Sequence, residues 1–127
     1  MRRSRLGIIT VVALFACEAA IAASGWHTAT ITRVLTDSRS AGDPAYPDAL
    51  RYGGCAVRVT PNPNATVPAC GNYISFGCDA EIYSRSVANT NYQAAQLAYV
   101  TGVSVSFWLD DRIMQNGSCV TPSVLVD

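Results

Sequence analysis

The chain has 127 residues, and its nine basic residues, all arginine, balance its nine aspartates and glutamates. A chain of this length holds one domain of ordinary size. Because no basic run or basic amphipathic helix occurs, nucleic acid and the membrane surface are not expected partners.

Residues 1–23 predict a secretory signal peptide. Arg2, Arg3 and Arg5 precede an apolar run over residues 6–16, and Ala20-Ile21-Ala22-Ala23 supplies small residues for cleavage after Ala22 or Ala23. The apolar run is too short to cross a bilayer, which takes about 20 apolar residues. No later segment is long and apolar enough, so we expect no transmembrane segment and a secreted or periplasmic protein.

The leader also permits an alternative to ordinary cleavage, namely lipidation. Leu14-Phe15-Ala16-Cys17 resembles a bacterial lipobox, in which Cys17 would be acylated and anchor an outer-membrane lipoprotein. In either case four cysteines remain: Cys55, Cys70, Cys78 and Cys119. In an oxidising compartment four thiols predict two disulfides, and their positions leave all three pairings open.

Residues 24–127 predict a single disulfide-bonded domain with five strands and one helix. Asn89 or Thr90 is expected to cap a helix that runs through Val100 and ends before Gly102. The strands are expected, from their β-branched residues and alternation, over residues 26–35, 51–60, 71–79, 103–109 and 119–126. The order β-β-β-α-β-β favours a five-stranded OB-like barrel. The alternative is an open α+β antiparallel sheet with the helix on one face.

Several of these segments resemble the binding subunits of bacterial AB5 toxins, in the subtilase-cytotoxin and pertussis-like branch. Cys55 and Cys70 bracket a strand and loop, and an alanine-rich helix containing Tyr92 and Tyr99 follows. The helix runs into Tyr99-Val100-Thr101-Gly102 and then a strand ending in Phe107-Trp108-Leu109-Asp110. The resemblance covers residues 26–110.

The resemblance implies an OB barrel, assembly into a pentameric homo-oligomer, and binding of surface glycans. It also implies a Cys55–Cys70 disulfide and, with it, a Cys78–Cys119 disulfide. The family's polar loop before the first strand has no counterpart, because only Ser24 and Gly25 precede Trp26 in the mature chain. Trp108 is the one position carried over as a ligand contact.

The alternation of side chains along the strand over residues 103–109 predicts the face on which Trp108 lies. If Val105, Phe107 and Leu109 face inward, Trp108 faces outward with Ser104 and Ser106. An indole flanked by hydroxyls can stack on a sugar ring and bind its hydroxyl groups. Packing beneath the helix or in a subunit interface is the competing interpretation. Tyr83 and Arg85, after the third strand, are placed at the same end of the barrel, or are ordinary loop residues.

No arrangement for catalysis, metal or cofactor binding is recognised. His27 is the only histidine, no nucleophile motif accompanies it, and we expect it at the surface or a strand edge. Asp110-Asp111 and the pair Asp79 and Glu81 are predicted to be exposed turn carboxylates, too few for a calcium loop. The chain is therefore predicted to be an exported, non-enzymatic module that binds a glycan or a protein surface. The competing class is a periplasmic structural or inhibitor-type protein that binds another protein through a sheet edge.

Overall fold

The computed structural model describes residues 22–36 and 54–127. Residues 1–21 of the predicted leader, with Cys17, and the predicted strand start at residues 51–53 lie outside the described residues. The elements within the described part are β1 (Ser24–Thr36), β2 (Cys55–Thr60), the 3-10 helix η1 (Pro63–Ala65), β3 (Tyr73–Ser75), α1 (Arg85–Thr101), β4 (Val105–Asp110), β5 (Met114–Gln115), β6 (Ser118–Val120) and β7 (Val124–Val126).

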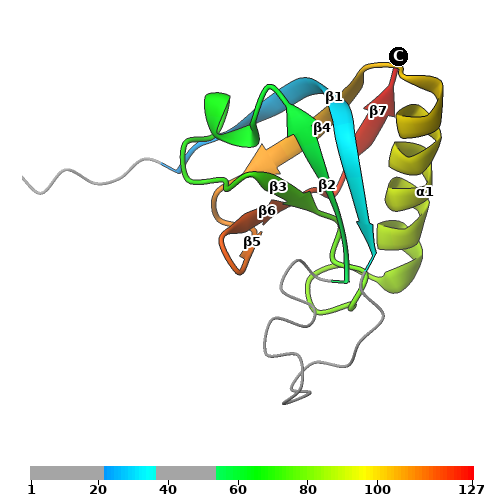
Figure 1. Cartoon of the computed structure of the whole chain (residues 1–127). Coiled ribbons are helices and arrows are strands. Elements are labelled where there is room, and N and C mark those ends of the chain that lie inside the picture. The colour runs from blue at the N-terminus through cyan, green and yellow to red at the C-terminus, as the bar shows by residue number, and fades with distance from the viewer. Residues whose placement is uncertain (1–21, 37–53) are drawn as a thin grey trace, which may run out of the picture.

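The seven strands of the described ranges form one mixed sheet in the order β5-β6-β3-β2-β1-β4-β7. Neighbours are antiparallel except for the parallel pair β3 and β6. The prediction of a mainly β domain with one helix is confirmed. The sheet is open rather than a closed barrel, and α1 lies along one side of it, against β1 and β7 (Figure 1).

The predicted fifth strand is divided at Pro122, and its two parts join opposite edges of the sheet. β6 pairs with β3, and β7 pairs with β4. Proline has no N–H to donate to a ladder, which favours a break in the pairing at this position. Between the two parts, Thr121 N–H donates to Ser75 O at 2.9 Å and Trp108 N–H donates to Ser123 O at 3.2 Å.

A bulge lies at Thr32 of β1, a strand whose two halves pair with different neighbours. The first half of β1 pairs with β4 and the second half with β2, and the register with β2 shifts between Ile31 and Arg33. Before the bulge the odd-numbered residues Ala29 and Ile31 are buried, whereas Arg33 is exposed and Val34 packs against the core. The extra residue therefore reverses the alternation and bends the strand.

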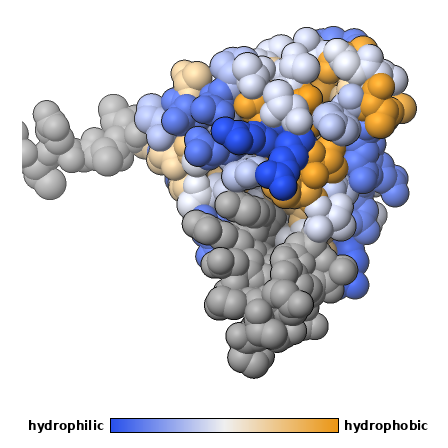
Figure 2. Space-filling view, viewed as in Figure 1, coloured by the Kyte–Doolittle hydropathy of each residue, from blue (hydrophilic) through white to orange (hydrophobic). Residues whose placement is uncertain are grey.

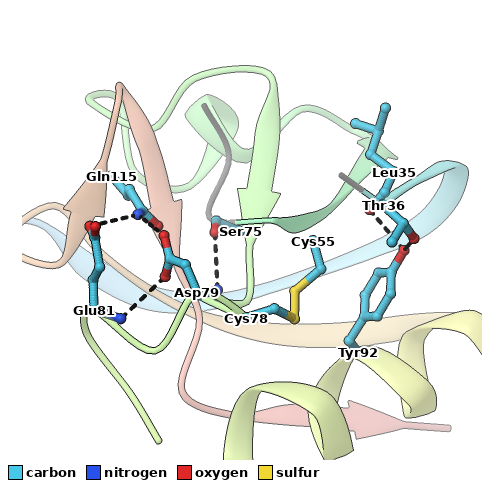
Figure 3. Close-up of a disulfide and its surroundings, with 10 residues drawn as sticks. Leu35, Thr36, Cys55, Ser75, Cys78, Asp79, Glu81, Tyr92 and Gln115 are labelled. Atoms are coloured by element: carbon cyan, nitrogen blue, oxygen red, sulfur yellow. Dashed lines mark hydrogen bonds between the residues drawn. A yellow bond between two sulfur atoms is a disulfide. The ribbon is translucent and has the colours of Figure 1, made fainter. Parts of the chain in front are cut away.

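The N-cap of helix α1 lies five or six residues earlier than predicted. Ser84 is its N-cap, with Val87 N–H donating to Ser84 Oγ at 3.4 Å, and Asn89 and Thr90 lie inside the helix. The predicted end is confirmed, because Gly102 adopts φ 72° and its N–H donates to Ala98 O. Tyr92 anchors the helix, since its hydroxyl donates to Leu35 O at 2.8 Å and accepts from Thr36 Oγ1 at 2.6 Å (Figure 3).

Two disulfides form, as predicted, but between different partners from those that the resemblance implies. Cys55 bonds Cys78 and Cys70 bonds Cys119, with Cα–Cα distances of 5.7 and 5.2 Å (Figure 3 shows the first). The antiparallel register of β2 and β3 explains the correction. Phe76 N–H donates to Cys55 O, so Cys55 lies beside the end of β3 from which Cys78 follows. Cys70 precedes β3 at its other end, where β6 brings Cys119 alongside.

Candidate functional site

The alternation predicted for the strand after the helix holds in β4. Val105, Phe107 and Leu109 are fully buried in the core, and Phe107 contacts the ring of Phe76. Trp108 and Ser106 lie on the outer side and are partly buried. The outward orientation of Trp108 therefore follows from the packing of its neighbours.

A second tryptophan lies directly across from Trp108. Trp26 of β1 is its Cα partner, and the two rings meet edge to face with centroids 5.6 Å apart and an interplanar angle of 72°. Trp26 remains 46% exposed. Sequence reasoning did not select Trp26, because only the register of β1 against β4 brings the two tryptophans of the chain together.

Polar and apolar side chains extend this surface. The next outward pair is Thr28 and Ser106, whose hydroxyl oxygens are 2.7 Å apart. Leu125 of β7 lies opposite Ser106 and is exposed. We call these five residues the tryptophan face: Trp26, Thr28, Ser106, Trp108 and Leu125. Its chemistry is that of two indole rings beside a pair of hydroxyl groups, with one aliphatic side chain at the margin.

The other predicted site residues lie outside the tryptophan face. Ser104 precedes β4 and is exposed, and its carbonyl accepts from Asp127 N–H at 3.3 Å. Arg85 is the exposed first residue of α1. Burial raises the pKa of Tyr83, and the charge of Asp110 adds to this. Within residues 22–36 and 54–127, no hydrogen bond or ring contact joins Tyr83 or Arg85 to Trp108.

The prediction that Asp110 is an exposed turn carboxylate is wrong. Asp110 is only 4% exposed, and Arg112 binds it with its backbone N–H, Nε and Nη2, at 2.9, 2.8 and 2.5 Å. The side-chain hydrogen bond from Arg112, followed by the backbone one, lowers the pKa of Asp110 to about 2. The Asp110 carboxylate is therefore charged and bound by Arg112, and its role is to stabilise the turn after β4.

The remaining carboxylates of the described turns also have structural partners. Asp111 is partly buried and accepts from Ala23 N–H. Asp79 accepts from Gln115 Nε2 and from Glu81 N–H, and Glu81 accepts from Gln115 as well (Figure 3). No group of three or more potential metal ligands gathers in the part of the chain that the structure describes.

His27 is buried, at 2% exposure, which corrects the expectation of a surface or edge histidine. Its Nε2–H donates to Pro61 O at 2.9 Å, because a carbonyl can only accept. In the neutral ring Nδ1 then accepts from the Thr66 hydroxyl at 2.8 Å. Both nitrogens are engaged in holding β1 to the segment around η1, so His27 has a structural role.

Comparison with family models, with curated proteins and with solved structures gave no match for this chain. No helix within the described ranges is long and apolar enough to cross a membrane.

Proposed function

We propose that the protein is an exported, non-enzymatic binding module that binds a glycan on the tryptophan face. One observation carries the proposal: Trp26 and Trp108 form an edge-to-face pair on the outer side of the sheet, and Trp26 keeps nearly half of its surface exposed. An exposed aromatic pair of this kind offers a large apolar contact at a fixed geometry.

The neighbouring hydroxyls give the face its polar component. A sugar ring presents C–H groups on its faces and hydroxyls at its rim, so it can contact an indole and bind polar groups beside it. Thr28 and Ser106 share one hydrogen bond, which leaves one hydroxyl proton and several lone pairs for a ligand. The strands hold these groups in place, since both pairs belong to the β1–β4 ladder.

An OB-like architecture is part of the same proposal. The divided fifth strand reaches both edges of the sheet, with β6 beside β3 and β7 beside β4. We propose that the sheet corresponds to an OB-like barrel that stays open, with its last strand interrupted at Pro122. In keeping with the resemblance to AB5 binding subunits, we propose a pentameric ring in which several copies of the face act together.

A protein partner is the second candidate, and exposed apolar side chains favour it. Leu125 and Val126 lie on the edge strand β7, at 53% and 43% exposure. Leu97 and Val100 are also exposed, and hydrophobic surface is visible over the C-terminal end of α1 (Figure 2). In this alternative the protein is a periplasmic structural or inhibitor-type protein that binds through its sheet edge.

A glycan array with the exported protein tests the first proposal. We expect binding to a defined set of glycans, and loss of that binding in Trp26→Ala and Trp108→Ala. Leu97→Ala is the matched control, since it removes an exposed apolar side chain from α1, outside the tryptophan face. Binding that survives both tryptophan substitutions overturns the proposed site. Absence of glycan binding, together with a protein complex that Leu125→Asp disrupts, supports the protein-binding alternative.

A further inference from the structure

Ala23, the residue that precedes β1, is held in the fold by hydrogen bonds of its backbone N–H and carbonyl. Ala23 N–H donates to the carboxylate oxygen Oδ2 of Asp111 at 2.9 Å, and Asp111 N–H donates to Ala23 O at 3.1 Å. The side chain of Ala23 packs against the core, whereas Ala22 is exposed. The bond from Asp111 N–H joins the two backbones just beyond the last ladder pair, Ser24 and Asp110, and the bond to Oδ2 adds a side-chain contact.

We propose that the leader is cleaved between Ala22 and Ala23, and that the new α-ammonium of Ala23 forms an ion pair with Asp111. The inference rests on the proposed export. Hydrolysis adds water across the Ala22–Ala23 peptide bond, so Ala22 leaves as a carboxylate and Ala23 gains an ammonium group. The nitrogen that already faces Asp111 thereby becomes positively charged, and charge-assisted hydrogen bonds are about twice as strong as neutral ones.

Cleavage one residue later would have the opposite effect. Removal of Ala23 deletes both hydrogen bonds and leaves the Asp111 N–H without its partner. The sequence agrees with the earlier bond, because Ala20-Ile21-Ala22 has small residues at both positions of the A-x-A pattern, whereas Ile21 would occupy the first of them for cleavage after Ala23.

The neighbouring charges leave Asp111 available for the new terminus. Arg112 follows Asp111 in the chain, and its guanidinium is bound to Asp110 through Nε and Nη2. Asp111 has a weaker electrostatic influence on Arg112 than Asp110 has. Each carboxylate of this pair therefore has its own partner, Arg112 for Asp110 and the terminal ammonium for Asp111.

Intact mass measurement and N-terminal sequencing of the chain exported by a bacterial host test the cleavage. The expected product begins at Ala23. A product that begins at Ser24 or at an acylated Cys17 overturns this inference while leaving export in place. A full-length chain that stays in the cytoplasm overturns the proposed export, and the inference with it.

The ion pair has its own test, in two chains that differ only at the amino end. In a chain that begins at Ala23 the nitrogen is an ammonium, and in one that begins at Ile21 it is an amide. We expect Asp111→Asn to raise the unfolding equilibrium constant about fivefold more in the first chain than in the second, from the greater strength of hydrogen bonds between charged groups. Asp127→Asn serves as the control for the loss of one negative charge. Equal effects of Asp111→Asn in both chains overturn the ion pair.

Discussion

Removal of the Cys70–Cys119 disulfide is expected to destabilise the protein more than removal of Cys55–Cys78. The first bond joins residues separated by 49 positions and the second by 23. If a cross-link acts by restricting the unfolded chain, closure of these loops contributes about 4 and about 3 kcal/mol at 25 °C. Of the four bonded cysteines, all but Cys78 are nearly or fully buried. Alanine substitution of Cys70 and Cys119 therefore also removes packing in the core.

Urea unfolding of the two double variants, Cys70→Ala with Cys119→Ala and Cys55→Ala with Cys78→Ala, measures this difference. Thiol titration of the same variants, produced without residues 1–22, measures the pairing itself. Each double variant should have no free thiol, because the other disulfide remains intact. Two free thiols per chain in the double variants would show that the cysteines pair differently and would refute the reasoning. Equal stability losses would refute the chain-entropy argument while leaving the pairing intact.

Three other substitutions test separate parts of the structure. Because the pKa of Asp110 is lowered to about 2, the unfolded chain binds a proton between about pH 4 and 2 that the folded chain does not. Stability should therefore fall as the pH drops through this window, and Arg112→Gln should weaken the dependence in acid unfolding curves. Arg58→Thr removes one of two exposed arginines paired directly across β1 and β2. We expect it to raise the unfolding free energy by about 0.5 kcal/mol, less at high salt; a loss of stability would contradict this. In Gly71→Ala the new Cβ meets the backbone oxygen of Gly117 at 2.6 Å, so a loss of about 1–3 kcal/mol is expected by urea unfolding, and an unchanged midpoint would contradict the close approach.

Features set by local pattern could be predicted from the sequence. The alternation of Val105, Phe107 and Leu109 gave the buried face of β4 and the outward direction of Trp108. Gly102 marked the end of the helix because its left-handed conformation suits glycine. The four cysteines outside the predicted leader indicated two disulfides, but the spacing of Cys55 and Cys70 carried no information about which strands lie side by side.

Features set by strand pairing could not be predicted. The bulge at Thr32 reverses the alternation of β1, and no residue pattern there signals it. The same is true of the contact between Trp26 and Trp108, and of His27, whose partners Pro61 and Thr66 belong to a loop more than 30 residues away. Pro122 did indicate an irregularity, although not that the strand divides between two edges of the sheet.

Binding of a glycan to the tryptophan face can be followed at the indole groups themselves. Both of its tryptophans lie on this face, so an NMR spectrum of the ¹⁵N-labelled protein shows indole N–H signals from the candidate site alone. Titration with a glycan selected on the array should shift both indole signals in a saturable manner, with the backbone signals of Leu97 and Val100 on α1 unchanged. Binding that shifts the α1 signals and leaves both indole signals in place would contradict the account.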